Sequence, residues 1–328
     1  MLLLLLALFG WTAAARAQSA AEFLRIGLGA RALSLGSAAQ AAEDDPSAVF
    51  WNPAFLGFSP RRGAEAMHAE NFGGAAGFDA LSVSLPVGRP GEEAVGIALL
   101  RLAIDDIPTT TNFRFEDVGA DGRPGTHDAG EGDGRWDPGE PVDVDPSAVV
   151  LRSDEEWALV LGYGRALGRG SSAGVAAKYL RQRVDDHQSS GFGVDAGARL
   201  ALARGFSLSA RLVDAAGTHI SWDNGARERI APRLELGLSR TVSLGARGTV
   251  RALASAGSGA WDGARGAREW HAGAEYSPCP RLHLRGGSAN GEPAFGAGVG
   301  IPGFRFDYAT MPFHELGATH RLSAVARW

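Results

Sequence analysis

The chain has 328 residues, of which 45% are hydrophobic and 46 are glycine, and its formal net charge is -5. Glycine and proline follow no triplet period and the apolar content is high, which argues against a collagen-like or a disordered chain. No cluster of lysine and arginine is interleaved with aromatic residues, so a nucleic-acid-binding surface is not indicated.

The start of the chain is typical of an export signal. Residues 2–9 read LLLLLALF and are followed by Ala15-Arg16-Ala17, which has the A-x-A form of a signal-peptidase site. We expect residues 1–17 to be a signal peptide, although the usual positive charge before the apolar run is missing. Beyond it, no apolar run approaches the ~20 residues that a membrane-spanning helix needs. The sequence predicts an exported protein without a transmembrane helix.

Residues 18–60 lack any strand-like alternation. They are predicted to be a helical or irregular segment that acts as a plug at one end of the fold. In the plainer alternative they only fill space, with Phe50, Trp51 and Phe55 packed and with Pro46 and Pro53 fixing turns.

From about residue 64, apolar side chains recur at every second position, which is the spacing of a β-strand. The connections between these segments alternate between short turns and longer loops, and residues 105–153 form the longest. Such alternation is typical of an outer-membrane β-barrel, with tight periplasmic turns and larger extracellular loops. Fourteen segments are predicted, at residues 64–70, 78–86, 94–104, 154–166, 171–183, 191–202, 206–214, 230–240, 246–256, 268–277, 281–288, 294–301, 303–310 and 318–328.

The alternation does not say which face meets water. In a soluble β-sandwich the apolar face would be the core, whereas in a membrane barrel it meets lipid and the polar face lines the lumen. The export signal, the number of strands and the C-terminal aromatic residue Trp328 favour the barrel. A terminal aromatic residue resembles the signal that the barrel-assembly machinery reads. The predicted fold is therefore an all-β, transmembrane, 14-stranded antiparallel barrel over residues 61–328, in contact with the lipid of a Gram-negative-type outer membrane.

The plug-like segment contains a motif made up of Gly29, Ala30, Arg31, Ala32, Leu33, Gly36, Asp44, Asp45, Pro46, Ser47, Ala48, Trp51, Asn52, Pro53 and Ala54. This motif resembles the N-terminal hallmark of the PorV/PorQ family. That family looks like a branch of the FadL-type fatty-acid transporter fold, a 14-stranded outer-membrane barrel whose N-terminal hatch also carries an Asn-Pro-Ala element. The resemblance implies a non-enzymatic barrel, and family members include a component of the type IX secretion system.

Two functional hypotheses remain open at this point. The first is a barrel of PorV/PorQ type that acts in protein secretion or cell-surface assembly through its extracellular loops, with secreted cargo proteins or a surface attachment complex as partners. The alternative is a FadL-type transporter of hydrophobic small molecules, which needs an apolar pocket near the plug. The strand pattern favours the first, because it places charge and glycine inside the barrel. These charges are expected to pair across the interior: Asp195, Arg199, Arg211, Arg233, Glu235, Arg305, Asp307, Arg321 and Arg327.

The 105–153 insertion is strongly acidic. Asp117, Asp121 and Asp128 occupy positions 1, 5 and 12 of an EF-hand-like loop. The loop departs from the usual EF-hand pattern at two positions, with glycine at position 3 and aspartate in place of glutamate at position 12. A second acidic turn follows, with Asp133, Asp137 and Glu140 as further candidate ligands. The pattern predicts weak Ca²⁺ binding at residues 117–145, and a solvated acidic loop is the alternative.

Catalysis is not indicated. The run from Gly170 to Gly174 matches G-x-S-x-G, but it joins two predicted strands rather than a strand and a helix. The scattered histidines and the single cysteine form no recognisable nucleophile or zinc site. The sequence therefore predicts a non-enzymatic protein.

Overall fold

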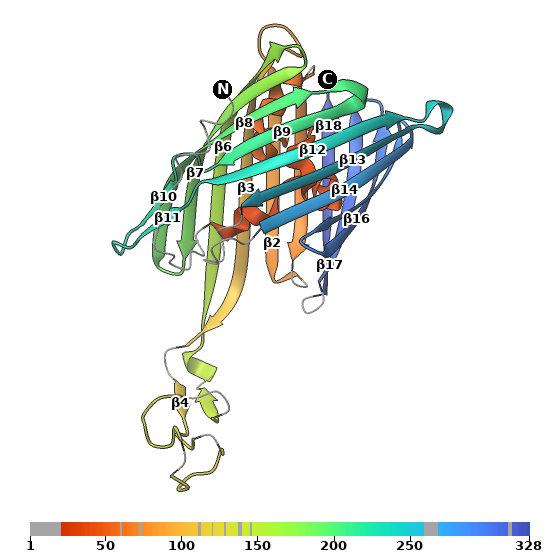
Figure 1. The fold of residues 1–328 in the computed structure, drawn as a ribbon. Helices are drawn as coiled ribbons and strands as arrows, with labels where there is room; N and C mark the ends of the chain where they lie inside the picture. Colours follow the sequence, from red (N-terminus) through yellow and green to blue (C-terminus); the bar gives the residue numbers. More distant parts are fainter. Residues whose placement is uncertain are drawn as a thin grey trace. The chain divides into compact units, whose positions relative to one another are not determined.

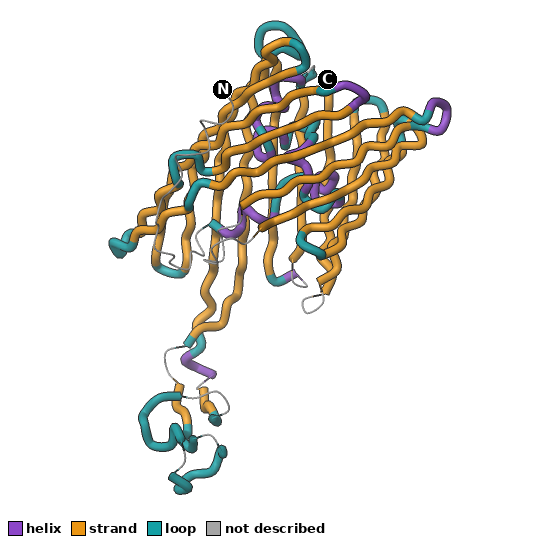
Figure 2. The backbone as a smooth tube through the Cα atoms, in the orientation of Figure 1, coloured by secondary structure: helices purple, strands orange, loops and turns teal. Residues whose placement is uncertain are grey.

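A computed structural model describes residues 21–59, 61–71, 74–110, 113–119, 121–127, 129–136, 140–144, 146–258, 268–313 and 317–328. Fourteen antiparallel strands form a closed barrel (Figures 1 and 2). They are β1 (Gly63–Asn71), β2 (Ala76–Pro86), β3 (Glu93–Thr109), β6 (Val150–Gly168), β7 (Ser171–Val184), β8 (His187–Ala201), β9 (Phe206–Val213), β12 (Arg233–Ser243), β13 (Thr249–Ser258), β14 (Arg268–Cys279), β15 (Leu282–Ala289), β16 (Glu292–Ile301), β17 (Phe304–Phe313) and β18 (Gly317–Arg327). The predicted strand number is confirmed.

Pairing between the first and last strands closes the sheet, with Gly63 of β1 opposite Arg327 of β18. The loop predicted at residues 215–229 contains two further strands, β10 (Thr218–Trp222) and β11 (Arg227–Ile230), and β10 extends the pairing of β8. The strand predicted to start at residue 230 begins at Arg233 instead. Pro232 precedes it and cannot donate a ladder hydrogen bond, which accounts for the later start.

The apolar face of the strands points outward. Along β8, for example, Phe192 and Val194 are exposed whereas Asp195 is buried. This arrangement rules out the soluble sandwich, because a sandwich would bury these apolar side chains in its core. The outward-facing set includes Leu81, Ile97, Leu99, Leu161, Val175, Phe192, Val194, Leu208, Leu234, Leu236, Leu238, Trp270, Phe295, Val299, Phe306 and Leu322.

Residues 21–58, called the hatch here, form five short helices. They are η1 (Glu22–Ile26), α1 (Ala30–Ser34), η2 (Ala38–Ala41), α2 (Ala48–Trp51) and η3 (Pro53–Phe58). Figure 2 shows them enclosed by the strands, and they contact the inner face of the wall, as where η2 and Leu35 pack against Leu253 of β13. No helix in the described part of the chain is long and apolar enough to cross a membrane.

Glycines on the inner face of the barrel let the hatch backbone lie directly against the wall. A Cβ atom added to Gly174 would overlap the backbone of Pro53, and one added to Gly273 or Gly287 would overlap that of Leu35. The high glycine content is thus partly explained by hatch packing, since only a residue without a side chain permits such close approach.

Residues 104–154 form a separate compact unit. It contains a two-stranded sheet of β4 (Phe113–Phe115) and β5 (Val142–Val144), and a short helix, η5 (Pro146–Ala148).

Candidate functional site: the hatch and the lumenal cavities

Arg31 is the centre of a buried ion-pair network between the hatch and the barrel wall. Its side chain is only 3% exposed, and it donates to Glu43 and Asp44 of the hatch at 2.9 and 2.6 Å. It also donates to both carboxylate oxygens of Glu275 on β14, at 2.9 and 3.2 Å. One guanidinium therefore joins α1, the turn after η2 and the wall.

The two aspartates that follow Glu43 extend this network to other strands. Asp45 accepts from Arg305 of β17 and from Arg327 of β18. Asp44 is bound by Arg251 of β13 at a longer distance of 3.4 Å. The acidic pair in the motif thus ties the hatch to three strands that are distant in sequence.

Burial and charge act in opposite directions on these carboxyl groups. Burial raises the pKa of Glu43 to about 7, even though Arg31 favours its ionised form. Burial also works against ionisation of Asp45, but Arg305 and Arg31 together lower its pKa. Among the described residues, only the carboxylates of residues 43–45 lie close enough together to hold a metal ion. Arg31 Nη1 already lies within 3.4 Å of each of them, so a guanidinium occupies the position that a metal ion would need.

Other motif residues fix the path of the hatch backbone. Trp51 Nε1 donates to the carbonyl of Leu28 at 2.8 Å. Asn52 is completely buried; its Oδ1 accepts from Ala54 N, and its Nδ2 donates to Ala210 O of β9 at 3.3 Å.

The glycines and prolines of the motif lie where the hatch backbone turns. Gly29 and Gly36 have positive φ values of 91° and 65°. Pro46 packs against Gly63 at the start of β1, and Pro53 begins η3. All motif residues lie in the described hatch.

Replacing Asn52 by alanine will destabilise the barrel. The change leaves the buried N–H of Ala54 without its side-chain acceptor, which costs about 1–3 kcal/mol. Urea unfolding followed by tryptophan fluorescence measures the loss. Asn224→Ala is the matched control, because the amide of Asn224 caps an exposed turn and its loss should change the unfolding free energy by less than about 0.5 kcal/mol. Equal losses in the two variants would contradict the assignment.

A cavity of about 660 Å³ lies between the hatch and the barrel ends that carry the longer loops. We call it the loop-end cavity. Its wall combines apolar hatch side chains with charged residues of the strands: Leu24, Ile26, Phe50, Trp51, Met311, Arg211, Arg233, Glu235, Glu269 and Arg321.

Arg321 is unusual in this wall. The residue is 4% exposed, and among the described residues it makes no ion pair with a carboxylate. Its Nη1 donates to the sulfur of Met311, and its Nε has no partner among the described atoms. A buried cation without a counter-ion is energetically costly, so this position is suited to a ligand that brings a negative or π-electron-rich group.

The other lumenal charges mostly follow the predicted pairing. Arg211 binds Asp195 at 2.5 Å, and the pairs Arg233–Glu235 and Arg305–Asp307 are both 2.7 Å apart. Arg327 pairs with Asp45 of the hatch.

Two predictions of ion pairing were wrong. Arg321 is the exception described above. Arg199 lies over the ring of Phe58 and donates to Ser207 instead of pairing with an acidic residue. The sequence pattern also missed Lys178, which is buried between Asp195 and Asp214.

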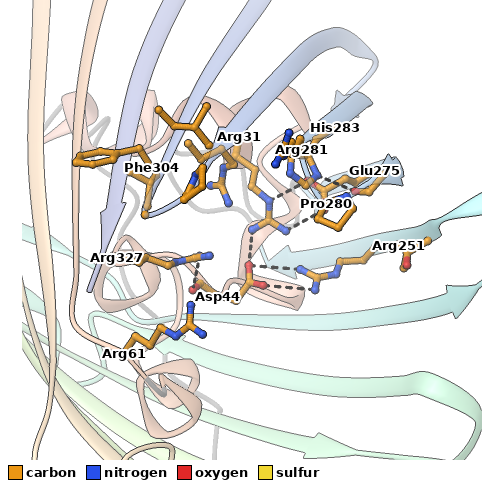
Figure 3. Close-up of a pocket in the computed structure, with 18 residues that line it drawn as sticks. Arg31, Asp44, Arg61, Arg251, Glu275, Pro280, Arg281, His283, Phe304 and Arg327 are labelled. Atoms are coloured by element: carbon orange, nitrogen blue, oxygen red, sulfur yellow. Dashed lines mark hydrogen bonds and ion pairs between the residues drawn. The ribbon is translucent and has the colours of Figure 1, made fainter.

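A second cavity, of about 560 Å³, opens at the opposite end, where the short turns lie. We call it the short-turn cavity. Figure 3 shows its wall, in which Arg31 and Arg251 both reach Asp44. Arginines dominate its lining, which includes Arg61, Arg281 and Arg327, with Pro280, Ile301, Pro302, Phe304 and Val325 as apolar neighbours.

The carboxylates of the described candidate calcium ligands accept hydrogen bonds from backbone N–H groups of the same loop. Asp117 accepts from the backbone of Gly132 and Gly134, and Glu140 from that of Val118 and Gly119. Asp121 and Asp133 each accept from the backbone two residues further on. Asp128 and Asp137 lie outside the described residues. Within the described part of the loop these carboxylates do not come together as a metal-binding group, so calcium binding stays a prediction.

Ser172 of the G-x-S-x-G match is buried in β7, and the match lies on a turn and a strand. The strand-to-helix turn of hydrolases is therefore missing at this place.

Comparison with solved structures identifies the fold as FadL-like. The Pseudomonas putida toluene transporter TodX is similar over 92% of this chain and 97% of its own, with a TM-score of 0.55 and 12% sequence identity. The CymD monoaromatic hydrocarbon channel gives a TM-score of 0.57 at 10% identity, over 92% of this chain and 98% of its own. A Pseudomonas aeruginosa FadL homologue gives 0.53 at 13% identity, over 90% and 97%. No protein-family model matches the chain, and no curated protein is significantly similar in sequence.

The predicted 14-stranded barrel with a short N-terminal helical segment is therefore confirmed, and its FadL-like character is shown at the level of the fold.

Proposed function

We propose that the protein is a non-enzymatic outer-membrane channel for small hydrophobic molecules, and that it prefers molecules with one anionic group. The outward apolar face fits a lipid environment. The observation that carries the proposal is the loop-end cavity, where apolar hatch side chains such as Phe50 and Trp51 lie near the buried guanidinium of Arg321. Within the described part of the chain, this guanidinium has no carboxylate partner. The similarity to structures described as toluene transporters and a monoaromatic hydrocarbon channel supports the same class of ligand.

Uptake experiments test this proposal. In a porin-deficient outer membrane, the protein should raise the uptake of toluene and of benzoate above that of cells without it. Arg321→Gln should lower benzoate uptake by about tenfold to a hundredfold and toluene uptake much less, because the lost charged hydrogen bond to the ligand is worth about 1.5–3 kcal/mol. Arg227→Gln, an exposed change on β11, is the control and should leave both rates unchanged. No uptake above background for either compound would refute the channel.

A role in secretion or cell-surface assembly is the second proposal, based on the resemblance of the hatch motif to the PorV/PorQ family. The 104–154 unit favours it, because it exposes Trp136 and Val142, apolar side chains suited to contact with a protein partner. Cargo proteins or a surface attachment complex would be the partners. Deleting residues 112–147 separates the two proposals, since it should abolish a cargo-dependent role and leave toluene uptake intact.

A further inference from the structure

The wall of the short-turn cavity carries more positive than negative charge. Three arginines are buried or nearly so and have carboxylate partners; Arg285, for example, binds Glu275 at 2.6 Å and Asp307 at 2.7 Å. Six arginines line the cavity itself, and Arg285 lies directly behind them. In and directly behind the wall lie seven arginines, Arg31, Arg61, Arg251, Arg281, Arg285, Arg305 and Arg327, and six carboxyl groups, those of Glu43, Asp44, Asp45, Glu65, Glu275 and Asp307.

The side chains of Arg61, just before β1, and Arg281, in the turn between β14 and β15, have no carboxylate partner among the described residues, and both line the cavity (Figure 3). Arg251 is only weakly bound to its carboxylate partner, because its two hydrogen bonds to Asp44 are both 3.4 Å long. Three guanidinium groups in the lining of one cavity therefore keep hydrogen-bond donors that the described carboxylates do not fully use.

This arrangement suits a tetrahedral oxyanion. Guanidinium groups bind phosphate oxygens in bidentate fashion, and donors that approach from several sides match a tetrahedral group better than a planar carboxylate. Asp44, which is 57% exposed in the same cavity, would repel an anion, but Arg31 and Arg251 already neutralise it. Two unpaired positive charges correspond to the charge of a phosphate dianion.

We propose that the short-turn cavity is a binding site for a phosphate group. The group can belong to free phosphate or to the headgroup of an anionic phospholipid. The second source is compatible with the cavity wall, because Ile301 and Phe304 line the cavity and are also exposed on the apolar outer rim of the barrel. This site is at the opposite end of the lumen from Arg321 and does not depend on the proposed transport function.

Binding to the purified full-length barrel tests the proposal. Inorganic phosphate is titrated calorimetrically into protein in a non-ionic detergent. In parallel, the protein is placed in nanodiscs of phosphatidylcholine with or without phosphatidylglycerol, and retained lipid is identified by native mass spectrometry. Saturable binding of phosphate points to the free anion, and selective retention of phosphatidylglycerol points to the lipid; either result supports the site.

A matched pair of double variants decides whether binding is local. Arg61→Gln with Arg281→Gln should weaken binding by about tenfold or more, because it removes the two unpaired guanidinium groups. Arg169→Gln with Arg204→Gln makes the same charge change in two other short turns and should change affinity by less than about twofold. Heat-modifiable migration on gels verifies that each variant is folded. Equal weakening in both variants, or no saturable binding by the unmodified protein to either probe, would overturn the proposal.

Discussion

Replacing Arg31 by methionine will detach the hatch from the barrel wall. The substitution removes the one guanidinium that contacts Glu43, Asp44 and Glu275 together. Removing one partner of a buried ion pair typically costs about 3–5 kcal/mol, because the remaining charges stay buried without compensation. We expect a hatch that is cleaved by protease in the folded barrel, and a higher ion conductance in planar bilayers. The barrel itself should remain folded, since its strands pair without the hatch.

Arg25→Gln is the control for this prediction. Arg25 also links the hatch to β14, through Glu269 at 2.9 Å, but its side chain is 43% exposed. Exposed ion pairs contribute about 0–1 kcal/mol, so protease resistance and conductance should stay close to those of the unmodified protein. If both variants open the barrel equally, or if Arg31→Met leaves the hatch protected, the central role assigned to Arg31 is wrong.

Replacing Gly287 by alanine will displace the hatch by steric overlap. A methyl group at this position of β15 would lie inside the van der Waals limits of Gly36 N and Leu35 C, which are backbone atoms and cannot rotate away. Overpacking of this kind costs about 1–3 kcal/mol, and we expect the upper end because neither side can yield without moving the backbone. The measurement is the urea unfolding midpoint, together with proteolysis of the hatch.

The adjacent glycine provides the comparison. A methyl group at Gly286 would face Phe295 at 3.9 Å, an ordinary contact, and both glycines are in the same strand. Gly286→Ala should therefore change the unfolding free energy by no more than about 0.5 kcal/mol. A stable Gly287→Ala variant with a protected hatch would show that the hatch does not pack against β15 as described.

The strands of the barrel were predictable from the sequence because the signal is local. A pleated backbone turns successive side chains to opposite faces, so the alternation of Phe192, Gly193, Val194 and Asp195 already indicates a strand with two different faces. The hairpin of β10 and β11 was missed, because a segment of only a few residues such as Thr218–Trp222 carries too little alternation to be distinguished from a loop.

The candidate site was predictable only in part. The motif residues Arg31, Asp44 and Asn52 could be named from their resemblance to a known pattern. Their partners could not, since Glu275 is 244 residues from Arg31 and Ala210 is 158 residues from Asn52. The sequence also predicted that Arg321 would form an ion pair with an acidic residue, and this prediction was wrong.

By itself, the sequence determined the strand periodicity, the number of barrel strands, their apolar and polar faces, and the position of the non-strand segment before them. Only the tertiary structure decided which charges neutralise one another, which guanidinium groups are left without a carboxylate, and where the cavities lie. The physical reason is the range of the forces involved. Backbone geometry acts between neighbours in the chain, whereas an ion pair or a cavity wall depends on strands that meet only after the barrel has closed around the hatch.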